Sequence, residues 1–175
     1  MKSVFVEGLV DNQGGVITAN ENIDFHTGGT LSNDGGSITL AGDTGRIRIY
    51  GNDSLTVQGG VLKSAGSIDI DMMGNVVFAP GTSSVYADKN FKVKGINFTN
   101  STSISVNGSV DINVSDDLLN NNDGSLISNN GFKLVSGGRI TNSGVISGDS
   151  VDITGASLDN NANAEITGGS GISSV

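Results

Sequence analysis

The feature that most constrains this chain is a repeat of about 21 residues that extends along its whole length. Each repeat contains a triplet in which two apolar residues flank a residue that is usually charged, except that the last triplet ends on serine. A period of this length indicates a repeat architecture, in which every unit packs on the unit before it and the unit after it. The triplets are Ile23-Asp24-Phe25, Ile47-Arg48-Ile49, Ile68-Asp69-Ile70, Phe91-Lys92-Val93, Val110-Asp111-Ile112, Phe132-Lys133-Leu134, Val151-Asp152-Ile153 and Ile172-Ser173-Ser174.

Two further landmarks recur in phase with the triplet. The first is an apolar residue that is followed two positions later by asparagine. Leu55-Thr56-Val57 and Val77-Phe78-Ala79 take its place in two repeats but lack the asparagine. Turns rich in Gly, Asn, Asp and Ser separate the landmarks, so each repeat is predicted to contain three short strands. The second landmark is a short apolar stretch centred on Ile17, Ile38, Leu62, Val85, Ile104, Leu126, Ile146 and Ile166.

Alternation with period two inside these stretches favours strands, and no stretch carries a helical stripe. Residues 1–175 are therefore predicted to be all-β: one right-handed parallel β-helix of about eight coils, each of roughly 21 residues with three short strands. The chain has 27 glycines and only 35% hydrophobic residues. Such a composition is typical of disorder, but here the apolar residues fall at regular intervals. We expect the segment to belong to a longer rod.

The residue between the two apolar positions of the triplet supports this alignment. It should face outward and lie directly against its counterparts on the neighbouring coils. Like charges on adjacent strands repel, so an in-register parallel stack favours alternating signs. The sign alternates through seven consecutive coils, and these residues form the predicted structural ladder: Asp24, Arg48, Asp69, Lys92, Asp111, Lys133 and Asp152.

The recurring asparagines are also interpreted as structural. Asparagine tolerates left-handed backbone angles at a corner, and stacked asparagine side chains form hydrogen bonds along a rod. The predicted structural asparagines are Asn12, Asn33, Asn100, Asn121, Asn142 and Asn160.

Composition excludes several classes of function. The net charge of −9 argues against a surface for nucleic acid or anionic membranes. No apolar run is long enough to span a bilayer as a helix, so membrane insertion is not expected. Because the chain has no cysteine, it has no disulfides, thiolate chemistry or cysteine-based zinc sites. Its amino terminus lacks the apolar core and cleavage site of a signal peptide.

Isolated residues with catalytic chemistry have simpler interpretations. Asp69 and Asp71 face outward on one predicted strand, and paired carboxylates can hydrolyse glycosidic bonds. Basic ladder residues interleave the acids, however, which indicates ion pairing. His26 is the only imidazole, and its predicted position at an exposed strand end favours a surface histidine over a catalytic triad. We predict no catalytic, cofactor-binding or metal-binding residues and no enzymatic activity. The five Asn-x-Ser/Thr sequences, a number close to chance, begin at Asn52, Asn97, Asn100, Asn107 and Asn113.

Repeats that read apolar-x-Asn-x-Gly, then Ile, then a turn and an apolar-x-apolar triplet resemble filamentous haemagglutinin-type repeats. The resemblance covers nearly the whole chain, although Val57, Ala79 and the turn at Pro80 depart from the pattern. It implies a large Gram-negative exoprotein that a dedicated outer-membrane transporter secretes (two-partner secretion). The Asn-Pro-Asn-type motif of the family's secretion domain is absent, which places the segment downstream of that domain. The clearest instances are Val10-Asp11-Asn12-Gln13-Gly14-Gly15-Val16-Ile17, Leu31-Ser32-Asn33-Asp34-Gly35-Gly36-Ser37-Ile38 and Ile140-Thr141-Asn142-Ser143-Gly144-Val145-Ile146.

The resemblance implies a secreted or cell-surface location and a role in cell adhesion and virulence. We accordingly expect a non-enzymatic structural or adhesive segment of an adhesin or toxin-delivery stalk. Its expected partners are a host-cell surface protein or glycan, the outer-membrane transporter of the full-length protein, and further copies bound end to end through uncapped coils. The alternative is a glycan-binding or glycan-cleaving β-helix, such as a phage tailspike or polysaccharide lyase. For that function, the aromatic residues available for stacking on sugars are Phe5, Tyr50, Phe78 and Tyr86.

Overall fold

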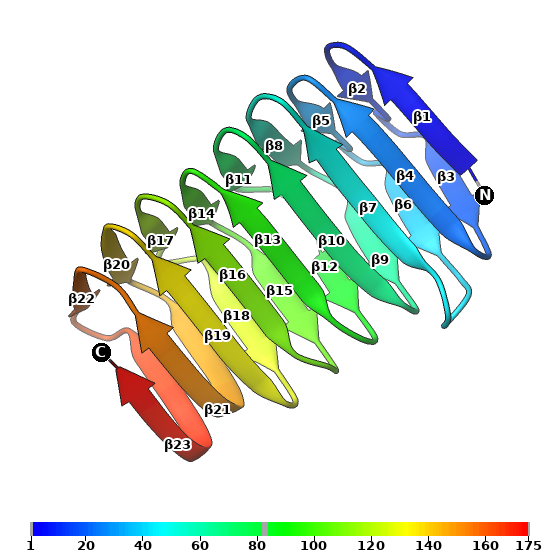
Figure 1. The fold of residues 1–175 in the computed structure, drawn as a ribbon. Helices are drawn as coiled ribbons and strands as arrows, with labels where there is room; N and C mark the ends of the chain where they lie inside the picture. Colours follow the sequence, from blue (N-terminus) through cyan, green and yellow to red (C-terminus); the bar gives the residue numbers. More distant parts are fainter. Residues whose placement is uncertain (1, 82–83, 175) are drawn as a thin grey trace.

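The computed structural model describes residues 2–81 and 84–174, and its described residues form strands and turns without a helix. The chain winds into a parallel β-solenoid of about 8 turns of roughly 21 residues (Figure 1). Each turn contributes one strand to each of three faces, so consecutive strands of a face are about one repeat apart in sequence. The predicted fold class, a parallel β-helix, is confirmed.

We name the faces in chain order. Face 1 consists of β1 (Lys2–Val6), β4 (Asn22–Thr27), β7 (Arg46–Gly51), β10 (Ser67–Met72), β13 (Phe91–Gly95), β16 (Val110–Val114), β19 (Gly131–Ser136) and the second half of β21 (Val145–Thr154). Face 2 consists of β2 (Val10–Asp11), β5 (Leu31–Ser32), β8 (Leu55–Gln58), β11 (Val76–Phe78), β14 (Phe98–Asn100), β17 (Leu118–Asn120), β20 (Arg139–Asn142) and β22 (Ser157–Asn160). Face 3 consists of β3 (Val16–Ala19), β6 (Ser37–Leu40), β9 (Val61–Ser64), β12 (Ser84–Ala87), β15 (Ser103–Val106), β18 (Ser125–Ser128) and the first half of β21. The last strand, β23 (Glu165–Ser174), pairs with β21 along both of its halves.

The core is a set of inward columns that run the length of the solenoid. On face 1, one column runs from Ile23 to Ile172 through each apolar residue that opens a triplet. On face 3, the eight predicted apolar residues from Ile17 to Ile166 pair in one unbroken register. Most members of these columns are fully buried. Because every inward residue contacts its counterparts above and below, the apolar area is buried only when coils stack.

Face 2 departs from the predicted alignment. Leu31 pairs with Val57, so Leu55 lies two residues away from its expected partner. In the next coil Val76 and Phe78 point inward, whereas the alignment predicted Val77 and Ala79. The predicted structural residue Asn121 is also displaced by one position, because Asn120 is the residue that pairs with Asn142. The strands of this face are two to four residues long and contain adjacent apolar residues, so alternation alone does not fix their register.

The buried asparagines form hydrogen-bonded columns inside the corner after face 2. In the longer column, Asn100 Nδ2 donates to Asn120 Oδ1 at 2.9 Å, Asn120 Nδ2 to Asn142 Oδ1 at 2.8 Å, and Asn142 Nδ2 to Asn160 Oδ1 at 2.8 Å. The first three are fully buried. Each of them also donates to backbone carbonyls at the corner. Side-chain hydrogen bonds thus satisfy amide groups that would otherwise be costly to bury.

A second, shorter column contains Asn12 and Asn33, whose Nδ2 and Oδ1 atoms are 2.7 Å apart. It ends where Asn33 Nδ2 donates to the carbonyl of Val61 at 2.7 Å. Left-handed angles do not explain any of the asparagines in these columns, because Asn163 is the only described non-glycine residue with positive φ. The left-handed positions after Asn12 and Asn33 belong to Gly14 and Gly35, each with φ of 63°.

Between the two asparagine columns, the interior is filled by aromatic rings. Phe78 pairs with Asn100 in register, so it stands where an asparagine stands in later coils. Its ring lies 6.0 Å from that of Phe91 and 6.1 Å from that of Phe98, centroid to centroid. All three are fully buried. Packing of these rings therefore replaces the missing asparagine hydrogen bonds in the middle of the solenoid.

We predict that Asn120→Ala lowers the free energy of unfolding by about 1–3 kcal/mol, because it removes the buried hydrogen bonds that Asn100 and Asn142 make with this side chain. Exposed Asn122, two residues away, provides the control, and Asn122→Ala should change this free energy by less than about 0.5 kcal/mol. Urea unfolding followed by circular dichroism measures both. Equal losses for the two variants would contradict the assigned register.

Candidate functional site

The most distinctive surface of the molecule is the outer side of face 1. We call it the charged face and define it by the outward residues of β4, β7, β10, β13, β16, β19 and residues 150–154 of β21. Long polar side chains alternate on it with the buried core residues of the same strands. It carries five basic and five acidic residues and is therefore electrically neutral: Arg46, Arg48, Lys92, Lys94, Lys133, Asp24, Asp69, Asp71, Asp111 and Asp152.

The seven residues of the predicted charge ladder form the central column of the charged face. The backbone register places Arg48 between Asp24 and Asp69, and Lys92 between Asp69 and Asp111. Lys133 follows Asp111, and Asp152 follows Lys133. Each of the five inner charges therefore has opposite charges on both neighbouring strands. The column ends at Ser173, whose hydroxyl donates to Asp152 Oδ1 at 2.9 Å.

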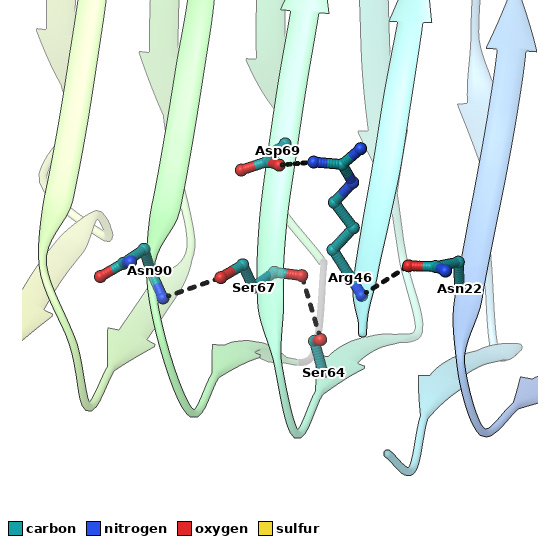
Figure 2. Close-up of polar contacts among 6 residues, drawn as sticks. All are labelled: Asn22, Arg46, Ser64, Ser67, Asp69 and Asn90. Carbon is teal, nitrogen blue, oxygen red and sulfur yellow. Dashed lines mark hydrogen bonds and ion pairs between the residues drawn. The ribbon is translucent and has the colours of Figure 1, made fainter. Parts of the chain in front are cut away.

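A hollow of about 360 Å³ lies in the middle of the charged face, across β7, β10, β13 and β16. Arg46, at the start of β7, reaches diagonally across it, and its Nη1 lies 3.5 Å from Asp69 Oδ2 (Figure 2). The Arg46 backbone N–H donates to Asn22 Oδ1 at 3.2 Å, which anchors the residue to the preceding coil. The Asp69 side chain is 28% exposed. This carboxylate is thus engaged by a guanidinium.

An aromatic stack borders the charged face at the ends of β4 and β7. The ring centroids of His26 and Tyr50 are 4.6 Å apart, with an angle of 16° between the planes. The Arg48 guanidinium carbon lies 4.5 Å from the Tyr50 centroid. His26 is therefore a stacking residue on the surface. Tyr50 already contacts a ring and a cation, which uses part of the surface that a sugar would need.

Sequence reasoning missed a polar cluster on the outer side of face 3. The Tyr86 hydroxyl donates to Asp88 Oδ1 at 2.5 Å, and Asn107 Nδ2 donates to the same oxygen at 2.6 Å. Asn129 Nδ2 donates to Asn107 Oδ1 at 3.0 Å, and Lys63 Nζ lies 5.5 Å from the Tyr86 ring centroid. The sequence did contain a signal for this cluster. Asp88, Asn107 and Asn129 each directly follow the face 3 strand of three successive coils.

This cluster shifts the pKa values of its two acids in opposite directions. The hydrogen bond that Tyr86 donates to Asp88 raises the pKa of the phenol above 10.0. The hydrogen bonds from Tyr86 and Asn107 lower the pKa of Asp88 below 3.8. Both shifts favour the neutral phenol beside the charged carboxylate, so the pair is stable as a hydrogen-bonded unit across the neutral pH range.

The remaining candidate residues do not gather into a reactive site. Asp71 pairs in register with Tyr50 and Lys94, which places it beside a base instead of a second acid. Of the sequon asparagines, Asn100 is fully buried and Asn97 is half-buried, whereas Asn52, Asn107 and Asn113 are exposed. Among the described residues, no group of three or more His, Cys, Asp or Glu side chains is arranged to hold a metal ion. The same part of the chain contains no helix that could cross a membrane.

We predict that Asp69→Lys lowers the free energy of unfolding by about 1 kcal/mol, because it places three positive charges on adjacent strands and removes the partner of Arg46. The control Asp123→Lys makes the same change of charge at an exposed turn away from the ladder. It should alter this free energy by less than about 0.5 kcal/mol. Thermal unfolding of both variants at low salt provides the measurement. Equal effects would show that the ladder does not have the assigned register.

We also predict that Asp88→Asn lowers the pKa of Tyr86 toward 10. Tyr50→Phe serves as the background, because the chain has only two tyrosines and Tyr86 then titrates alone. Tyrosinate absorbance against pH gives the midpoint. Since the folded pKa is raised, the stabilising contribution of the phenol is present below pH 10 and is lost as pH rises through the folded value. The contribution of Asp88 is present above pH 3.8 and is lost as pH falls through its lowered pKa. A midpoint that Asp88→Asn leaves unchanged would contradict the hydrogen bond.

Comparison with known proteins adds no relative to these observations. No protein-family model matches the chain, and neither a curated protein nor a solved structure is similar to it. The resemblance to filamentous haemagglutinin-type repeats therefore depends on the repeat motifs alone.

Proposed function

We propose that this chain is a non-enzymatic structural segment, a stiff rod that spaces or presents another part of a larger protein. The observation that carries this proposal is the uninterrupted parallel pairing of its coils. All three faces continue from the first coil to the last, so backbone hydrogen bonds connect every coil with the next. A stack of eight coils at about 4.8 Å per coil extends about 38 Å. Such a stack transmits force along its axis and gains length by adding coils.

The outward side chains support a spacer because they stabilise the stack itself. The charge ladder and the Arg46–Asp69 ion pair join neighbouring coils. Asn97 and Asn75 do the same at a turn, where Asn97 Nδ2 donates to Asn75 Oδ1 at 2.9 Å. Polar groups that hold adjacent coils in register maintain the shape of the rod. A catalytic centre requires instead acids and bases that converge on a substrate.

We further propose that the rod belongs to a secreted exoprotein displayed on a bacterial surface, as an adhesin segment or toxin-delivery stalk. The support is the resemblance of the repeats, together with a cysteine-free chain that suits export in an unfolded state. Its partners would be the outer-membrane transporter of the full-length protein and a host-cell surface protein or glycan.

We predict that the genomic DNA upstream of this segment encodes a secretion domain beside a gene for an outer-membrane transporter. Sequencing of the flanking DNA tests this directly. The downstream sequence separates the two forms of the proposal, because a toxin module indicates a stalk and further repeats indicate an adhesin. A short gene within a phage tail cluster would refute the exoprotein and favour the tailspike alternative.

The glycan-binding or glycan-cleaving alternative receives less support from the surface. Phe78 is buried in the core, and Tyr50 and Tyr86 are each in contact with a cation. The side chain of Phe5 lies outside the described residues. Incubation with a panel of acidic and neutral polysaccharides tests this function, with Asp69→Asn and Asp71→Asn as matched variants. We expect no chain shortening, and shortening that either variant abolishes would establish the alternative.

A further inference from the structure

Charge is distributed unevenly over this molecule. The charged face contains five of the nine basic residues but only five of the eighteen acidic residues. The rest of the chain therefore carries four basic and thirteen acidic residues, which accounts for the whole net charge of −9. Two copies that approach through their other surfaces repel each other, because like charges meet there. The neutral charged face is the surface through which copies can approach without this repulsion.

We propose that the charged face binds the charged face of a second copy of this chain, with the two rods antiparallel. The twofold axis lies in the interface between the two faces, runs parallel to the strands and passes between β10 and β13. This interaction is lateral, and it differs from end-to-end contact between coils because it uses outward side chains of β4 to β19 and no unpaired strand edge.

Symmetry selects the antiparallel arrangement. In a parallel pair related by a twofold axis along the rods, each coil faces its own copy. Asp69 would then face Asp69, and Lys92 would face Lys92. In an antiparallel pair whose axis lies between two neighbouring strands, each odd-numbered coil faces an even-numbered coil. Because the ladder alternates in sign with every coil, each acid then faces a base. The interface uses the same patch on both copies and closes as a dimer.

The hollow locates the axis. It spans β7, β10, β13 and β16, so its centre lies between β10 and β13. With the axis there, the register brings Asp69 to Lys92 of the second copy, Arg48 to Asp111, and Asp24 to Lys133. The charges beside the ladder also find partners, because Asp71 meets Lys94 of the second copy and Arg46 meets Ser109. No two like charges face each other in this arrangement.

The size of the face indicates a weak, reversible dimer. Six strands at about 4.8 Å, each about five residues wide, give a patch of roughly 30 Å by 15 Å. The area is about 450 Å² per copy, or about 900 Å² in total, which falls in the range of transient complexes. Electrostatic complementarity then provides orientation and specificity more than affinity.

A zero-length carbodiimide cross-link between Asp24 and Lys133 tests the arrangement on the unaltered chain. Within one chain these residues are five coils, about 24 Å, apart, so a direct bond between the carboxyl and the amine can form only between copies. We expect this cross-linked peptide at high protein concentration, and we expect a fivefold or greater loss in 0.5 M salt, where the Debye length falls to a few ångströms. Its absence from a protein that does cross-link at other pairs would overturn the proposal.

Charge reversal provides a second test by sedimentation velocity at 0.1 M salt. We expect Lys92→Glu and Asp69→Lys each to abolish the concentration-dependent mass increase, because like charges then meet beside the axis. An equimolar mixture of the two variants should restore it, since opposite charges meet again.

The control Lys89→Glu changes net charge as Lys92→Glu does but lies at a turn off the charged face. It should associate as the unaltered chain does. A monomer at every concentration, or association that Lys92→Glu leaves intact, would overturn the proposal. Where a reversed charge unfolds its variant, the cross-link decides.

Discussion

Side chains on the strands of this rod lie next to their counterparts on the neighbouring coils, because parallel strands repeat about every 4.8 Å. This spacing is the constraint on which the rest of the structure depends. Each residue must therefore be compatible with the residues of the same column on the neighbouring coils. Apolar columns become a dry core, asparagine columns become hydrogen-bonded chains and charged columns must alternate in sign. A single coil has none of these contacts, so stability belongs to the stack.

The polar columns differ in energetic weight according to burial. The amides of Asn100, Asn120 and Asn142 are inaccessible to water, and each donates to the next coil and to backbone carbonyls. Loss of one removes buried hydrogen bonds from its neighbours in the column, which is costly. The ladder charges are partly or fully exposed, so each pair contributes little to stability and chiefly fixes which residues face each other. The same weakness leaves these charges available for contact with another molecule.

The sequence was sufficient to predict the solenoid and the columns of faces 1 and 3, because their strands are four to six residues long and alternate clearly. Face 2 was predicted less well, since adjacent apolar pairs such as Leu118–Leu119 satisfy either register. Burial of Asn120 decides between them. The Arg46–Asp69 pair could not be predicted, because it depends on a side-chain direction across coils that periodicity does not specify. For the Tyr86 cluster, the sequence indicated only that Asp88, Asn107 and Asn129 occupy equivalent positions, and the hydrogen bonds again depend on side-chain directions. Neutrality of the charged face, in contrast, follows from the sequence once the outward positions are known.

The most direct test of the stacked register is hydrogen exchange of the asparagine side-chain amides, resolved by nuclear magnetic resonance. Buried amides that donate to the next coil should exchange only when the stack opens. We expect slow exchange at Asn100, Asn120 and Asn142, and fast exchange at exposed Asn122. Exchange at Asn120 as fast as at Asn122 would contradict a continuous asparagine column. It would also contradict the coil register that places the charges on the charged face.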